Sequence, residues 1–227
     1  MDFVITGANR GIGLGLVRGV LALGHRVVAT ARNVAAASEL HALAQPGLEL
    51  ASLDLGASRS VEVFARGLGD RPIDVLINNA GVYGGPGDLE AFDAEDALAT
   101  FRVNAVAPLE LSRALLPALR RSRVRKIVNM SSRMASIAEN TSGGAYAYRM
   151  SKTALNMATV SMAIDLAAEG FIVVAMNPGW VKTAMGGPGA PTSIEASVAG
   201  MLGQIERLRP EDSGHFVDYL GRGPIPW

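Results

Sequence analysis

Short apolar segments rich in β-branched residues alternate with longer helical patterns along the chain of 227 residues. The expected strands cover 3–5, 26–31, 49–53, 75–77, 126–130 and 172–176. Helical patterns cover 12–23, 34–44, 58–68, 95–121, 148–168 and 193–207, and a short run follows at 215–219. Several of these strands are continuously apolar, as in a parallel sheet that is buried on both faces. The alternation predicts an α/β fold, with one Rossmann-type doubly wound parallel sheet and helices on both faces.

The glycine-rich run at 6–13 (Thr-Gly-Ala-Asn-Arg-Gly-Ile-Gly) lies between the first apolar segment and the first helical pattern. Glycine has no Cβ and tolerates positive φ, so such a turn lets the backbone approach a pyrophosphate. The helix that follows would offer unpaired N–H groups to the phosphates. The spacing Gly-x3-Gly-x-Gly differs from the common dinucleotide fingerprint, so an ordinary tight turn is the alternative. The residues expected to contact a dinucleotide are Gly7, Asn9, Arg10, Gly11, Ile12 and Gly13.

Composition limits the classes of function. Lys plus Arg and Asp plus Glu number 21 each, so there is no net basic field to attract nucleic acid or anionic lipid. The one basic run, at 120–126, is expected to be the solvated end of a helix. Without cysteine, and with three histidines that lack metal-ligand spacing, no disulfide or metal site is expected. We expect one domain over 1–227 and, with no apolar stretch of about 18 residues, no integral membrane segment and a cytoplasmic protein.

The end of the second expected strand predicts which dinucleotide binds. A carboxylate about 20 positions past the glycines would accept hydrogen bonds from a free ribose 2′-hydroxyl. This chain has Arg32 there, a planar donor suited to a phosphate, and Arg10 points to the same neighbourhood. NADP(H) is therefore favoured, with NAD(H) as the alternative if these arginines are merely solvated.

Two further strand ends fit the same cofactor. Asp54 closes the third expected strand, where its carboxylate would accept from an adenine amino group or cap the following helix. The small residues after the fourth strand would let the backbone lie against the cofactor. These are Asn79, Ala80 and Gly81. The glycine- and proline-rich loops at 83–87 and 186–191 would lie on the same edge of the sheet, as binding loops or as plain connections.

Tyr148 and Lys152 lie four residues apart and so share one face of the expected helix. A tyrosine pKa near 10 is too high for efficient proton exchange at neutral pH, and a nearby cation would lower it. The pair is therefore a candidate general acid/base. Tyr146 has no lysine four residues on and is expected to be a packing aromatic. Ser131 and Ser132 end a strand, where a hydroxyl could bind a substrate oxygen or simply form a turn.

Six motifs occur in order: the run at 6–13, Asn-Asn-Ala-Gly at 78–81, Asn104, the serine pair, Tyr148-x3-Lys152, and Pro-Gly-Trp-Val-Lys-Thr at 178–183. Together they resemble the short-chain dehydrogenase/reductase family over nearly the whole chain. The resemblance implies a proton-relay tetrad of Asn104, Ser132, Tyr148 and Lys152. Tyr148 would be the acid/base, Ser132 would polarise the substrate oxygen, Lys152 would bind the nicotinamide ribose, and Asn104 would hold a water. The residues implied at the nicotinamide end are Pro178, Gly179, Val181 and Thr183.

Within that family the segments at 131–134, 140–152, 179–188 and 226–227 resemble C-factor (C-signal) proteins, which are known as developmental signals. Ser132 lies 16 residues before Tyr148, farther than in many members, so Ser136 is a rival for its role. The segment after Thr183 is short, which implies an open pocket. Its expected walls are Tyr83, Met134, Trp180 and Met185, unless these side chains only pack their loops.

We therefore expect an NADPH-dependent oxidoreductase of a small carbonyl or alcohol substrate. The alternative is a nucleotide-binding signalling or regulatory protein with little physiological turnover. The expected helices 95–121 and 148–168 have apolar faces broader than contact with one sheet requires, and in relatives this pair forms a subunit interface. A homodimer or homotetramer is expected for that reason, and the alternative is that these helices are fully buried within a monomer.

Overall fold

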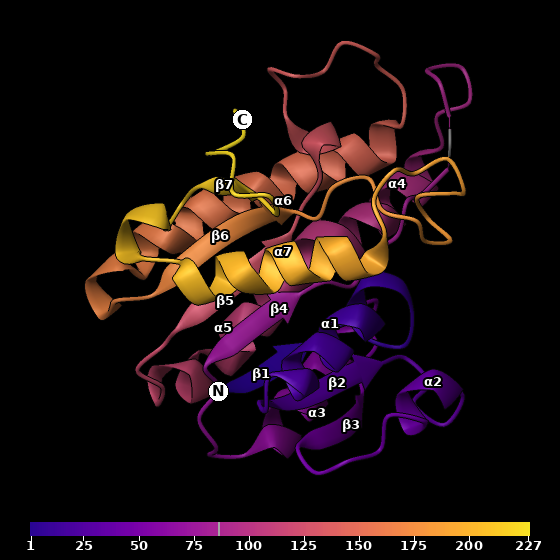
Figure 1. Cartoon of the computed structure of the whole chain (residues 1–227). Helices are drawn as coiled ribbons and strands as arrows, with labels where there is room; N and C mark the ends of the chain where they lie inside the picture. Colours follow the sequence, from indigo (N-terminus) through magenta and orange to yellow (C-terminus); the bar gives the residue numbers. More distant parts are fainter. Residues whose placement is uncertain (86) are drawn as a thin grey trace.

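The computed structural model describes residues 1–85 and 87–227. Pro86, which belongs to the loop expected at 83–87, lies outside the described residues. Within them, seven parallel strands form one sheet in the order β3-β2-β1-β4-β5-β6-β7 (Figure 1). The strands are β1 (Asp2–Ile5), β2 (Arg26–Ala31), β3 (Leu48–Ser52), β4 (Val75–Asn78), β5 (Lys126–Met130), β6 (Ile172–Asn177) and β7 (Phe216–Asp218). The predicted doubly wound sheet is confirmed.

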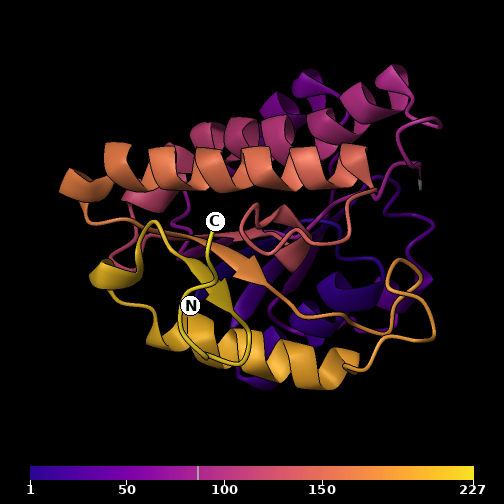
Figure 2. The ribbon, with the colours of Figure 1, turned by 90° about the horizontal axis from the view of Figure 1, so that it is seen from above.

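Helices cover both faces of the sheet, and Figure 2 shows α6 and α7 on opposite sides of it. One face packs against α1 (Gly11–Ala22), α2 (Ser38–His41) and α7 (Ile194–Arg207). The other packs against α3 (Ser58–Leu68), α5 (Ala107–Arg120) and α6 (Tyr146–Asp165), with α4 (Ala94–Phe101) beside α6. Neighbouring strand residues divide between the two cores, as Val4 and Ile5 do, because successive side chains point to opposite faces. Burial on both faces explains the continuously apolar strands.

Two expected helices differ from the structure. The segment 95–121 is interrupted by a π-helical turn, η1 (Arg102–Val106), between α4 and α5. Pro108 has no N–H to donate to the carbonyl of Asn104, which favours a change of helical register there. The helix expected at 34–44 is only the short α2, because Asn33 Oδ1 accepts from the N–H of Ala36 and forms a turn instead.

The helix expected at 148–168 is also displaced. It begins two residues earlier, as α6, and ends at Asp165 before a 3₁₀ turn, η3 (Ala167–Glu169). Three other elements, β2, α3 and β5, have the predicted bounds.

Arg120 and Arg121 of the basic run at 120–126 are exposed at the end of α5, as expected, but the later residues of the run enter the fold. Lys126 is a buried strand residue, and its Nζ donates to the carbonyls of Ile205 (2.7 Å) and Glu206 (3.2 Å) at the end of α7. Burial lowers the pKa of Lys126. Arg125 donates to main-chain oxygens, including that of Ser122 at 2.8 Å. Lys126 and Arg125 donate to main-chain carbonyls that helix ends and turns leave without partners. These two cations therefore stabilise the fold and do not only face solvent.

None of the helices in the described part of the chain is long and apolar enough to cross a membrane. Across residues 1–85 and 87–227, no group of three or more histidine, aspartate or glutamate side chains could hold a metal ion.

Candidate active site

The candidate site lies beyond the carboxyl ends of the central strands. Strand order reverses between β1 and β4, and in open parallel sheets ligands bind at such a reversal. The glycine turn follows β1, and the residues 79–81 follow β4. Ser131 and Ser132 follow β5, and the segment 178–183 follows β6. The topology therefore brings the predicted motifs to one edge of the sheet.

The glycine turn is built around close backbone contacts. Gly7 has φ +62°, and a Cβ there would lie 2.8 Å from the Cα of Ala80. A Cβ on Gly13 would lie 2.3 Å from the carbonyl oxygen of Gly7. Asn79 Nδ2 donates to the carbonyls of Thr6 (2.8 Å) and Gly7 (3.3 Å), which joins the loop after β4 to the turn. These contacts exclude larger side chains and give the turn one defined shape.

The start of α1 is suited to an anion. Arg10 precedes the helix with extended backbone and makes no side-chain cap, so the first N–H groups of α1 are left for another acceptor. Thr183 lies across this helix start, since a Cβ on Gly11 would be 3.4 Å from Thr183 Cγ2. The segments after β1 and β6 therefore approach each other where a dinucleotide pyrophosphate would fit.

Three charged residues, Arg10, Arg32 and Asp54, are predicted to bind the cofactor. Arg10 and Arg32 are both exposed, and neither forms an ion pair with any residue in the described ranges. Asp54 lies two residues beyond Ser52, the end of β3, instead of closing the strand. Its Oδ1 accepts from the N–H of Gly56 (2.9 Å), so it orders the turn before α3 and does not cap the helix. Its exposed carboxylate keeps free acceptor capacity.

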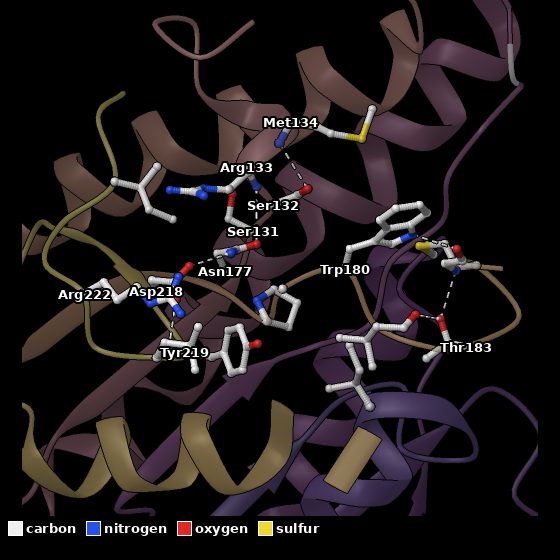
Figure 3. A pocket seen from close by; sticks show the side chains of 18 of the residues that line it. Ser131, Ser132, Arg133, Met134, Asn177, Trp180, Thr183, Asp218, Tyr219 and Arg222 are labelled. Carbon is white, nitrogen blue, oxygen red and sulfur yellow. Dashed lines mark hydrogen bonds between the residues drawn. The ribbon is translucent and has the colours of Figure 1, made fainter. Parts of the chain in front are cut away.

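Tyr148 and Ser132 line the same cavity (Figure 3 labels Ser132). Ser132 precedes a 3₁₀ turn, η2 (Arg133–Ala135), and its Oγ accepts from the N–H of Met134 (3.2 Å). The rival Ser136 is buried, accepts from the N–H of Glu139 (3.1 Å) and is not among the residues that line this cavity.

Two other tyrosines lie near Tyr148: Tyr83 packs against it, and Tyr146 precedes it by two residues in the sequence. The ring of Tyr83 stacks on that of Tyr148, with centroids 4.8 Å apart. Tyr146 packs edge-on against Phe92, with centroids 6.3 Å apart, as expected of a packing aromatic. The half-buried Tyr83 ring therefore covers one side of the candidate acid/base.

The pKa shifts of Tyr148 and Lys152 differ from the prediction. Burial raises the pKa of Tyr148 to about 12, against a smaller lowering by a hydrogen bond with Ser132. Burial also lowers the pKa of Lys152 to about 8. The prediction that Lys152 lowers the pKa of Tyr148 is wrong in this structure, because desolvation dominates both groups. The Lys152 ammonium lies 5.9 Å from the Tyr148 ring centroid and donates to the Met130 carbonyl (2.7 Å).

Asn104 lies in the π-helical turn and is fully buried. Its amide binds both main-chain groups of Val82, accepting from the N–H (2.9 Å) and donating to the carbonyl (2.8 Å). It also donates to Ser151 Oγ (3.0 Å), which in turn donates to the Tyr148 carbonyl (2.8 Å). A Cβ on Gly81 would be 3.1 Å from Asn104 Oδ1 and 3.4 Å from Lys152 Nζ. The four tetrad candidates are thus held in one connected region.

The cavity has a volume of about 830 Å³. Its lining includes all four residues predicted as walls, Tyr83, Met134, Trp180 and Met185, together with Ile12 of the glycine turn. Trp180 is 59% exposed, and its indole is held by Nε1, which donates to the Gly186 carbonyl (2.7 Å). The lining also includes the predicted nicotinamide-end residues Pro178, Gly179, Val181 and Thr183.

Sequence reasoning missed the far wall of the cavity. Asn177, Asp218, Tyr219 and Arg222 all line it, and Figure 3 shows them on the side away from Trp180 and Thr183. Asn177 ends β6, so its place at a carboxyl end was an available signal. The segment 218–226 has no periodicity that could have placed it.

The comparisons with known proteins agree with this geometry. A sequence model of the family described as short chain dehydrogenase matches residues 3–192. The chain is 51% identical over 167 residues to the C-signal protein of Myxococcus xanthus, which covers 74% of this chain and all of that protein. The carbonyl reductase Sniffer of D. melanogaster has a similar structure, with TM-score 0.95 at 36% identity, covering 100% of this chain and 99% of that one. An NADPH-bound carbonyl reductase from chicken fatty liver has TM-score 0.94 at 35% identity, covering 100% and 98%.

Proposed function

Because this chain belongs to the short chain dehydrogenase family of oxidoreductases, we propose that it is an NADPH-dependent reductase of a carbonyl substrate, reversible to the alcohol. The observation that supports this most strongly is the convergence of Ser132, Tyr148 and Ile12 of the glycine turn on one cavity. Lys152 is buried, with its ammonium 5.9 Å from the centroid of the Tyr148 ring. A protein that only bound nucleotide would have little use for a buried phenol beside a substrate-sized space.

The chain's own residues fit NADP(H). The glycine turn and the uncapped start of α1 would hold the pyrophosphate, and Arg10 and Arg32 would bind a 2′-phosphate. Asp54 would accept from the adenine amino group, and Thr183 would lie at the nicotinamide end. When bound, NADPH supplies the hydride, and the protein supplies position and the proton. NAD(H) remains the alternative cofactor.

Tyr148 is in the protonated form at neutral pH, as a proton donor in carbonyl reduction must be. With a pKa of about 12, the Tyr148 hydroxyl keeps its proton at neutral pH and can donate it to the substrate oxygen. The Ser132 hydroxyl would donate a second hydrogen bond to that oxygen and so polarise the carbonyl. Lys152, fixed by the Met130 carbonyl, would bind the nicotinamide ribose. Asn104 would hold a water through the acceptor capacity left on its Oδ1, and that water would reconnect the proton relay to solvent.

The first experiment titrates the protein with NADPH and with NADH by calorimetry. Tighter binding of NADPH that weakens on Arg32→Ala supports the cofactor assignment, whereas preference for NADH refutes the role of Arg32. Turnover of a carbonyl substrate is then compared between wild type and Tyr148→Phe. Loss of turnover with retained NADPH binding supports the acid/base role, and Tyr146→Phe is the matched control because that ring only packs against Phe92.

The second candidate function is a nucleotide-binding signalling or regulatory role. The 51% identity to the C-signal protein is the observation that favours it. Tyr148→Phe separates the two functions, because a binding role would survive the loss of the phenol oxygen. A variant that keeps the biological effect without turnover would support the signalling role.

The exposed apolar face of α4 and α6 supports a homodimer or homotetramer. Met150, Met157 and Ile164 lie seven residues apart along α6, and Met157 and Ile164 are 68% and 70% exposed. Leu98 of the neighbouring α4 is 64% exposed. A contiguous face of this kind is typical of a subunit interface. Light scattering that detects only a 23.7 kDa species would refute the oligomer. The cytoplasmic location expected from the sequence stays a prediction.

A further inference from the structure

The segment 218–226, called here the C-terminal strap, closes one side of the cavity and is pinned at both ends. At one end it continues from β7, and at the other Ile225 donates its N–H to the carbonyl of Phe216 (2.7 Å). The Trp227 ring stacks on Phe216 with centroids 5.6 Å apart, and the Trp227 main-chain oxygen accepts from the N–H of Ala138 (3.0 Å). The strap is therefore a fixed wall. It also lies beyond residue 192, where the family match ends.

Arg222 lies at the turn of this strap. Its neighbours Gly221 and Gly223 have φ +68° and +95°, conformations that side-chain-bearing residues rarely adopt. Gly221 also packs against α7, because a Cβ there would lie 2.4 Å from Gln204 Nε2. The two glycines and this contact set where the strap turns, and Arg222 lines the cavity from that point (Figure 3).

The other charged groups that line the cavity already have partners. Asp218 accepts through both oxygens, from Asn177 Nδ2 (2.9 Å) and from the N–H of Leu220 (2.9 Å). Arg133 forms an ion pair with Glu139 at 3.2 Å. Arg222 makes no ion pair with any residue in the ranges 1–85 and 87–227. Its exposed guanidinium therefore has donors free for a ligand at the cavity wall, whereas the carboxylate oxygens of Asp218 are each engaged by a neutral donor.

The cavity also has two chemically different ends. Trp180 and Met185 make the end near Thr183 aromatic and apolar, and the ring of Tyr83 stacks on Tyr148. Arg222 and Asp218 lie at the opposite end, with the serine pair between them (Figure 3). The cofactor residues around Thr183 take up part of this cavity, so a substrate would occupy the space between Tyr148 and the strap, with the apolar side chains near its reacting carbon and Arg222 at its far end.

From this arrangement we propose that Arg222 binds the anionic end of an elongated carbonyl substrate, so that the site prefers oxo acids to neutral carbonyls of the same length. The inference rests on the proposed reductase function and names the substrate class of that site. A guanidinium can bind a carboxylate through two parallel hydrogen bonds, which a neutral ester cannot reproduce.

The experiment compares straight-chain ω-oxo carboxylic acids of increasing length with their methyl esters, using NADPH consumption as the readout. In wild type, kcat/KM should be higher for the acids and should pass through a maximum at the length that joins Tyr148 to Arg222. Arg222→Ala should lower kcat/KM for the best acid by about ten- to one-hundredfold and leave its ester unchanged. Arg222→Lys should recover part of the loss. Arg66→Ala, which removes an exposed arginine of α3 away from the cavity, controls for net charge.

Equal kcat/KM for acids and esters in wild type, or an equal loss for both in Arg222→Ala, would overturn the assignment. If neither compound is reduced, the proposed function fails, and binding alone decides the role of Arg222. Calorimetry then titrates the NADP⁺-saturated protein with an unreactive straight-chain monocarboxylate. Binding that disappears in Arg222→Ala supports the anion site, whereas no binding, or binding indifferent to the substitution, overturns it.

Discussion

Replacing Lys152 by methionine should stabilise the folded protein at neutral pH. The lysine is 4% exposed, and its ammonium donates to one main-chain oxygen, that of Met130, at 2.7 Å. Burial lowers its pKa from 10.5 to about 8. At neutral pH the folded protein therefore buries a charged ammonium in a desolvated environment, which is unfavourable. Methionine has a similar length and no charge, so it should fill the same space without that cost.

The magnitude follows from the pKa. A lowering from 10.5 to about 8 corresponds to a cost of about 3 kcal/mol when the lysine is charged in both the folded and unfolded states. Loss of the hydrogen bond to Met130 offsets about 1 kcal/mol of the gain. Lys152→Met should therefore raise the free energy of unfolding by about 2 kcal/mol at neutral pH.

The sign of this effect changes with pH. Between about pH 8 and pH 10.5 the unfolded chain keeps the proton that the folded protein has released. The contribution of Lys152 to the free energy of unfolding of the wild type therefore rises as the pH rises through this range. Above this pH range Lys152 is neutral in both states, and burying it no longer costs free energy. Lys152→Met should then be less stable than wild type by about 1 kcal/mol, because it lacks the hydrogen bond to the Met130 carbonyl.

Urea unfolding of both proteins across this window measures the difference directly. Lys182→Met, which removes an exposed lysine, is the matched control for loss of the residue type. The reasoning is refuted if Lys152→Met is less stable than wild type at neutral pH and the difference stays constant through the window. The same variant should lose carbonyl turnover, because a residue kept at a cost in stability is expected to serve function.

Three further predictions concern the site, the glycine turn and the subunit interface. Ser132→Ala should lower kcat for a carbonyl substrate by about a hundredfold or more, measured by initial rates, while Ser136→Ala should have little effect; equal losses would leave Ser136 as a rival. Gly13→Ala should cost about 1–3 kcal/mol in thermal unfolding and weaken NADPH binding, because its Cβ would overlap the Gly7 carbonyl. Gly67 lies in α3 with open space where a Cβ would be, so Gly67→Ala should instead stabilise the folded protein by about 0.5–1 kcal/mol. Met157→Glu should lower the mass seen by light scattering; an unchanged oligomeric mass would show that this face is not the interface.

Local pattern determined much of the fold in advance. The bounds of β2, α3 and β5 follow from periodicity and from the turn residues around them. The glycine turn could also be anticipated, because glycine adopts the positive φ that a tight turn between a strand and a helix requires, as Gly7 and Gly11 do. Its need for glycine at position 13 became specific only when the structure showed Gly7 and Asn79 packed against it.

Only the tertiary structure decided the properties that depend on partners distant in the sequence. Lys126 belongs to a basic run, yet it is buried against the end of α7, about which local periodicity carries no information. The pKa of Tyr148 likewise depends on how completely neighbouring elements exclude water, and this desolvation outweighs the lysine four residues away. Arg222 became part of the cavity because β7 and the strap fold back across it. A sequence of this kind determines which segments form strands, helices and tight turns, whereas burial, and with it charge and specificity, is set only when those segments pack together.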